Sequence, residues 1–158
     1  MAQRPHALLP RLLKAMKFNR DTTILFLQAL GKKSMDIADP LAASGVRSIR
    51  MLKELPKGKI SSLVMNDGNP QACESIAQNF QLSKLSKAKT ALANAEANLF
   101  LHSIDACDYI DIDPFGSPYP FLDAAVQDLS RGGMLALTAT DTSALSGSHP
   151  AACKRKYW

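Results

Sequence analysis

Short apolar segments alternate with longer helix-type segments, and this alternation constrains the fold more than any other feature of the chain. Four segments read as buried strands, SMDIADP, KISSLVMND, DYIDID and MLALTAT, and residues 90–95 are a weaker candidate. Helix-type stretches separate them: LAASGVRSIRMLKEL, PQACESIAQNF and YPFLDAAVQDL. Strands joined by crossover helices form a parallel sheet, so we predict an α/β sandwich with a mostly parallel sheet and flanking helices.

The N-terminal stretch is basic and contains two prolines. Pro5 and Pro10 predict against one continuous helix there, because proline lacks the backbone N–H that a helix interior needs. We therefore expect a basic surface arm over residues 1–17 and the folded domain over residues 18–158. Asp21 is expected to cap the first helix of the domain, which runs through TTILFLQAL.

The composition is that of a folded domain with an excess of basic residues. The apolar fraction is 46% and the charged fraction 21%, and nineteen Lys and Arg face fourteen Asp and Glu, giving a net charge of +5. A basic balance fits a polyanionic partner, because neutralising phosphates releases counterions. The balance alone does not identify such a partner, since many soluble domains are mildly basic.

The three cysteines, Cys73, Cys107 and Cys153, are dispersed and form no C-x-x-C pair. We therefore expect neither a zinc site nor a redox motif, and no bound metal. An odd number of dispersed cysteines suits a reducing compartment. No apolar run approaches the length of a membrane span, so we expect a cytoplasmic protein without a membrane segment.

Two loops after predicted strands have the composition of nucleoside-binding loops. The first runs from Asp39 to Gly45 and consists largely of small residues, which let a ligand approach the backbone and the following helix N-terminus. Asp67 follows about twenty residues later, where an acid can accept both ribose hydroxyls. A tight turn without a ligand, and a loop or helix-capping aspartate, remain open alternatives. The dinucleotide fingerprint G-x-G-x-x-G is absent.

The sharpest feature is the segment from Asp113 to Pro118, DPFGSP, which directly follows an apolar strand. Its prolines stiffen the loop and its glycine permits unusual dihedral angles. The ring of Phe115 could stack on a base, while the Asp113 carboxylate accepts a hydrogen bond and then a proton from an exocyclic amine. The alternative is a rigid proline turn whose aspartate caps the following helix.

Five segments together resemble the tRNA (guanine(26)-N2)-dimethyltransferase family: FNRD, ASGVRSIR, NDGNP, DIDPFGSP and TATDTSALSGSHPAACKRKY. They occur in the family's order over residues 18–157. The resemblance implies a Rossmann-like class I methyltransferase fold, S-adenosyl-L-methionine as cofactor, and the transfer of one or two methyl groups to a guanine amino group in tRNA.

The resemblance also implies roles for individual residues. Asp113 matches the proposed catalytic acid, and Phe115 matches the ring that stacks on the target base. We also expect Phe115 and Pro114 to form the base slot. The residues that match the cofactor-binding positions are Arg20, Asp39, Gly45, Arg47, Asp67, Glu96 and Ala97.

Departures from the family pattern leave other hypotheses open. Glu96 stands where the family has aspartate, and the family's upstream aromatic segment is not recognisable in residues 1–17. We expect the chain to be part of a methyltransferase domain, completed by a further domain or a partner chain. One alternative is a fragment that binds cofactor or RNA without turnover. Another is an adenine-N6 methyltransferase acting on nucleic acid, which the continuation 116–118 disfavours. A nicotinamide oxidoreductase would need the absent glycine fingerprint.

Overall fold

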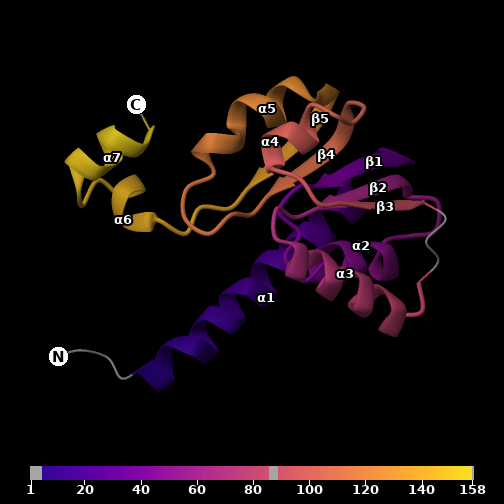
Figure 1. Cartoon of the computed structure of the whole chain (residues 1–158), viewed down its shortest axis with the longest axis horizontal. Coiled ribbons are helices and arrows are strands. Elements are labelled where there is room, and N and C mark those ends of the chain that lie inside the picture. The colour runs from indigo at the N-terminus through magenta and orange to yellow at the C-terminus, as the bar shows by residue number, and fades with distance from the viewer. Residues whose placement is uncertain (1–4, 86–88, 158) are drawn as a thin grey trace.

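The computed structural model describes residues 5–85 and 89–157, with residues 5–15 as backbone only, so residues 1–4 of the expected arm lie outside the described residues. Five parallel strands form one sheet in the order β3-β2-β1-β4-β5 (Figure 1). They are β1 (Met35–Asp39), β2 (Ile60–Asn66), β3 (Thr90–Ala93), β4 (Cys107–Ile112) and β5 (Leu129–Leu137). The predicted α/β sandwich with a parallel sheet is confirmed, and each predicted strand is present.

Helices cover both faces of this sheet (Figure 1). On one face lie α1 (Pro5–Ala29), α2 (Val46–Glu54) and α3 (Pro70–Leu82), and on the other α4 (Ala97–Leu101) and α5 (Leu122–Gln127), which a 3₁₀ turn, η1 (Tyr119–Phe121), precedes. Two short helices, α6 (Thr142–Leu145) and α7 (Pro150–Tyr157), follow β5 and stand apart from the helices packed on the sheet.

The core consists of two hydrophobic clusters, one on each face. The first joins Leu27 of α1, Met51 of α2 and Phe80 of α3 to β1 and β2. The second joins Phe100 of α4 and Ala125 of α5 to β1 and β4. Because β1 and β4 contribute to both clusters, they are buried on both sides, as expected for the central strands of a parallel sheet.

The prediction of a helix break at the N-terminal prolines is wrong. One continuous helix, α1, runs from Pro5 to Ala29 and passes through the predicted boundary at residue 17. Pro5 occupies the first helical position, where no N–H donor is needed, and Pro10 removes a single hydrogen bond near the helix start. Asp21 consequently lies inside the helix and does not cap it. Although α1 has 25 residues, none of the helices in the described part of the chain combines the length and hydrophobicity needed to cross a membrane.

The fifth strand begins earlier than predicted. β5 starts at Leu129, pairs there with Cys107, and resumes its pairing with β4 at Met134 after a shift of register. The intervening residues form a bulge that contains Gly132 with a φ of 75°. Glycine is typical of bulges and atypical of strands, so the Arg-Gly-Gly segment indicated a turn before the strand, whereas it interrupts the strand.

The chain order of the strands defines a switch point beside β1. From β1 the chain moves outward to β2 and β3, then crosses back to β4 on the other side of β1. The loops after β1 and β4 therefore diverge, and ligands of open α/β sheets bind in the crevice between such loops. Both motif loops of the sequence, 39–45 and 113–118, begin at this crevice.

Candidate active site

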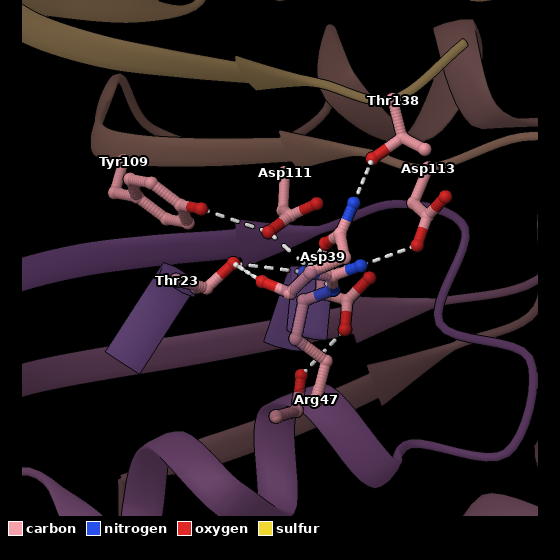
Figure 2. Close-up of polar contacts among 9 residues, drawn as sticks. Thr23, Asp39, Arg47, Tyr109, Asp111, Asp113 and Thr138 are labelled. Carbon is pink, nitrogen blue, oxygen red and sulfur yellow. Dashed lines mark hydrogen bonds and ion pairs between the residues drawn. The ribbon is translucent and has the colours of Figure 1, made fainter. Parts of the chain in front are cut away.

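Four charged residues meet at the carboxyl ends of β1 and β4, and we call them the carboxylate cluster: Asp39, Arg47, Asp111 and Asp113. Asp39 is the last residue of β1. Asp111 lies within β4, and Asp113 follows on the same face of the strand because side chains alternate along it. Arg47 reaches these carboxylates from the first turn of α2 (Figure 2).

The Arg47 guanidinium connects α1 to both ends of the cluster. Its Nη1 donates to Asn19 Oδ1 at 2.7 Å and to Thr23 Oγ1 at 2.9 Å, both on α1. Its Nε lies 3.5 Å from Asp111 Oδ2, and its Nη2 donates to Asp113 Oδ2. The Arg47 side chain is only 9% exposed, so this guanidinium is bound on nearly every side by protein groups.

Burial controls the protonation of the deeper carboxylates. Burial raises the pKa of Asp39 to about 7, and the nearby charge of Asp111 acts in the same direction, against the hydrogen bond that Ser48 Oγ donates to Asp39 Oδ2 at 2.7 Å. Burial also raises the pKa of Asp111, although Arg47 and the Tyr109 hydroxyl, 2.8 Å from Asp111 Oδ2, oppose the rise. The cluster therefore carries less negative charge than three ionised carboxylates would supply.

Asp113 retains one oxygen for a ligand. Its Oδ2 is bound by Arg47, whereas its Oδ1 has no hydrogen-bond partner among the described residues. Figure 2 shows this second oxygen directed away from Arg47. The Asp113 side chain is 35% exposed, so it is partly open to solvent. Asp113 does not cap the next helical element, because η1 has no side-chain cap.

The rest of the 113–118 loop is rigid but presents one ring to solvent. Pro114 is buried, whereas the Phe115 side chain is fully exposed, at 101%. Gly116 has a φ of 100°, which a residue with a side chain rarely adopts. Two hydrogen bonds hold its backbone: Gly116 N donates to Thr140 Oγ1 at 2.7 Å, and Thr140 N donates to Gly116 O at 2.9 Å.

Asp67 joins the loops that follow β1 and β2. Its Oδ2 accepts from the N–H of Ala43 at 2.9 Å, and its Oδ1 accepts from the N–H of Asn69 at 2.9 Å. The N-cap of α3 is Asn69 and not Asp67. A carboxylate can accept about four hydrogen bonds, so Asp67 keeps acceptor capacity for a ribose diol.

Buried Asn66 brings a third loop to the same place. Its side-chain amide donates to Pro40 O and to Ala95 O, each at 3.0 Å, and its Oδ1 accepts from Ala95 N at 2.9 Å. Glu96 follows and caps α4, because its carboxylate accepts from two backbone N–H groups of that helix. Ala97 is buried at the start of α4. The loops after β1, β2 and β3 thus converge around Asp67.

Gly45 and Arg20 are two further residues that match the family's cofactor-binding positions. Gly45 has a φ of 70°, which residues with a side chain rarely adopt, and a Cβ there would lie 3.1 Å from the side chain of Ile76, which would have to shift. Arg20 is half-buried on α1 and has no hydrogen-bond or ion-pair partner among the described residues. An unpaired guanidinium of this kind suits a carboxylate ligand.

A cavity of about 420 Å³ opens between α1 and the ends of β4 and β5. Arg47 and Asp111 are in its wall, and Phe18, Phe26 and Leu137 are exposed at its rim. The other matched cofactor residues do not line it. Among the residues described by the structure, no cluster of His, Cys, Asp or Glu is arranged to hold a metal ion.

Sequence reasoning missed three residues that organise the site. The side chain of Asn19 accepts a hydrogen bond from Arg47 and donates one to Thr138 Oγ1 at 3.1 Å, so it links α1 to the end of β5. Asn19 lies in the segment FNRD, and Thr138 begins the segment TATD. Because both segments carry the family resemblance, they were the signal that could have identified these two residues. Asp111 precedes Asp113 by two residues, and strand alternation would have placed both carboxylates on one face.

Comparison with known proteins shows the family to which the chain belongs. The family described as N2,N2-dimethylguanosine tRNA methyltransferase matches residues 14–158. The tRNA (guanine(26)-N(2)/guanine(27)-N(2))-dimethyltransferase of Aquifex aeolicus is 41% identical over 147 residues, which cover 90% of this chain and 37% of that protein. The tRNA (guanine(26)-N(2))-dimethyltransferase of Methanopyrus kandleri is 42% identical, with coverage of 91% and 37%.

A solved structure supports the same relationship. Trm1 from Pyrococcus horikoshii, in complex with S-adenosyl-L-methionine, superimposes with a TM-score of 0.79 at 34% identity, over 90% of this chain and 41% of that chain. This chain therefore spans about two fifths of the length of these relatives. The matched family, the extent of the match and the shared fold agree, and the chain belongs to the N2,N2-dimethylguanosine tRNA methyltransferase family.

Proposed function

We propose that this chain carries the methyl-transfer site of a tRNA guanine-N2 methyltransferase that adds one or two methyl groups to the exocyclic amine of a guanine, of the position 26 type. The observation that carries the proposal is the arrangement of Asp113 and Phe115. One carboxylate oxygen of Asp113 is fixed by Arg47, and the other has no hydrogen-bond partner among the residues that the structure describes; nearby, the ring of Phe115 is fully exposed. A free acceptor next to an exposed ring suits a planar base with an amino group.

The residues of the loop divide the chemistry between them. Phe115 stacks on the guanine, and Pro114, which is buried, stiffens the loop that carries this ring. Asp113 Oδ1 accepts a hydrogen bond from the exocyclic N–H and takes its proton as the nitrogen is alkylated. The amine is a poor nucleophile because its lone pair is conjugated with the ring, and holding its hydrogen directs the lone pair out of conjugation. The guanine must leave its stacked position to reach this loop.

The cofactor of this proposal is S-adenosyl-L-methionine, which supplies an electrophilic methyl group when bound. The residues present fit it. Asp67 has acceptor capacity for the ribose hydroxyls. Arg20, which has no partner in the described part of the chain, is a cation for the carboxylate of the methionine portion. Gly45 keeps the loop after β1 clear of side chains. Glu96 and Ala97, on the converging loop after β3, are assigned to the adenine side. Asp39 lies at the crevice, and Arg47 acts here through Asp113 as a positioning residue.

The decisive assay measures transfer of labelled methyl groups from S-adenosylmethionine to an unmodified tRNA transcript with guanine at position 26. An Asp113→Asn variant should lose 10²-fold or more in rate, because general-base assistance is typically worth this much. The same variant should still bind S-adenosylhomocysteine in calorimetry. A transcript with adenine at position 26 is the control for the base, and transfer to it would favour an adenine-N6 enzyme.

Two results would change the assignment. Wild-type protein that binds S-adenosylhomocysteine but transfers no methyl group would favour the fragment that binds without turnover. Asp113→Asn protein with a rate close to wild type would remove the assigned role of Asp113. The tRNA partner and a cytoplasmic location belong to the same proposal, because the relatives are named for tRNA modification.

A further inference from the structure

The segment after β5 combines exposed cations with exposed aromatic rings. Lys154, Arg155 and Lys156 occupy the last turn of α7, and all three side chains are exposed. Residues 142–157 contain no Asp or Glu. Phe115 of the 113–118 loop is 101% exposed, and Tyr119 at the start of η1 is 46% exposed. Aromatic rings beside cations are the combination that binds nucleic acid with unstacked bases.

Asp141 holds α7 in place and forms an ion pair with one of its three basic residues, Lys156. Asp141 Oδ1 accepts from the Tyr157 hydroxyl at 2.7 Å, and its Oδ2 lies 3.2 Å from Lys156 Nζ. The side chains of Lys154 and Arg155 have no hydrogen-bond or ion-pair partner among the described residues. Two positive charges thus remain for a ligand on a helix that is held at its last turn.

The same anchor places α7 beside the 113–118 loop. The Tyr157 ring packs edge-on against the Tyr119 ring, with centroids 5.9 Å apart and planes at 73°. The backbones of Thr140 and Gly116 are joined by hydrogen bonds, so the residues just before Asp141 are fixed to the loop that carries Phe115. Lys154 lies three positions before Tyr157, on the same side of the helix. Figure 1 shows α6 and α7 beyond the ends of β4 and β5, clear of the other helices.

We propose that Lys154 and Arg155 form a phosphate-binding surface for the RNA backbone that flanks the target guanine. This inference rests on the proposed function and deepens it. A base drawn out of its stack to Phe115 brings its own phosphates to the loop, and the free cations of the adjoining helix neutralise them. The contacts are electrostatic and independent of sequence, so they set affinity and position, while the 113–118 loop selects the base.

The test compares two double variants with the same loss of charge. Lys154→Gln/Arg155→Gln removes the proposed contacts. Lys33→Gln/Lys57→Gln removes two exposed lysines that precede β1 and β2, and so lie toward the amino ends of the parallel strands. Binding of each protein to an unmodified tRNA transcript is measured between 50 and 400 mM salt, with Kd plotted against salt concentration on logarithmic axes.

The first variant should bind about tenfold more weakly near 0.1 M salt, with a salt slope reduced by about two, one for each lost phosphate contact. The control should remain close to wild type in both quantities. Equal effects of the two variants, or no RNA binding by the wild-type chain, would overturn the inference. Methyl transfer by Asp113→Asn, measured in parallel, tests the proposed function separately, since that variant should lose transfer and retain RNA affinity.

Discussion

Replacing Arg47 with methionine should destabilise the fold far more than the loss of a surface ion pair. Methionine keeps much of the side-chain volume but removes the charge, and it leaves Asp111, 1% exposed, without a cation. Removing one partner of a buried ion pair costs about 3–5 kcal/mol, because the remaining charge is buried and uncompensated. Domains are typically stable by about 5–15 kcal/mol, so this variant approaches the limit of folding.

Urea unfolding followed by circular dichroism gives the measurement. With a denaturant slope of about 2 kcal/mol/M, the loss corresponds to a midpoint lowered by about 1.5–2.5 M. Arg50→Met is the matched control, because Arg50 lies on the same helix and pairs with Glu54 and Asp21 at 2.6 Å each, but these partners are about 40% exposed. Exposed pairs of this kind contribute about 0.2–1 kcal/mol.

A second substitution separates charge from packing. Adding Asp111→Asn to Arg47→Met should recover much of the lost stability, since the buried charge that needed the guanidinium is then gone. If Arg47→Met lowers the midpoint no more than Arg50→Met does, the carboxylate cluster is not a buried charge network in solution and the reasoning is refuted. If the double variant is less stable than Arg47→Met, the cost arises from lost packing and hydrogen bonds.

Three further outcomes follow from the site. Burial raises the pKa of Asp39 to about 7, so the folded state keeps a proton that the unfolded chain releases near pH 4. This group therefore lowers the free energy of unfolding as the pH rises from about 4 to 7, by up to about 4 kcal/mol. Asp39→Asn should flatten this pH dependence in urea titrations at several pH values. Glu96→Ala should cost about 1 kcal/mol in thermal unfolding through the lost cap of α4, and an unchanged midpoint would contradict the cap. Phe115→Ala should leave the unfolding midpoint unchanged within about 0.5 kcal/mol, because its ring is fully exposed, while methyl transfer falls; equal transfer by both proteins would count against stacking on Phe115.

Strands were easier to predict from the sequence than the ends of helices. More than half of the residues in each of β1, β2 and β4 are apolar, and a polar residue, Asp39, Asn66 or Asp113, ends or directly follows the strand. Central strands that are buried on both faces favour such apolar residues. The N-terminal helix was obscured because Pro5 and Pro10 were read as helix breakers, whereas both lie near the start of α1, where the loss of an N–H donor costs least. Only the later turns of α1 contribute to the core, through residues such as Leu27.

The loops that form the site could be predicted from the sequence, but the hydrogen bonds and ion pairs between their side chains could not. Asp113 and the loop after it were identified from their position behind a strand, and the structure places them at the switch point. The resemblance matched Arg47 to a cofactor-binding position, whereas the structure pairs it with Asp113 and Asp111. A guanidinium on a long side chain can reach several partners, and sequence spacing does not indicate which of them the fold brings within reach.

The bond between Asn19 and Thr138 has a consequence for the order in which the protein assembles. It joins residues 119 positions apart, and the contact of Arg47 with Asp113 spans 66 positions. Closing such long loops costs entropy before any contact repays it, so pairings of this kind form late in folding. On the ribosome, β1 and β2 can pair while the chain is still short, but the Asn19 contact must wait until Thr138 has emerged. Arg47, which holds Asp113, therefore gains this support only after residue 138 has emerged, and a nascent chain can pair β1 with β2 before the contacts around Asp113 are complete.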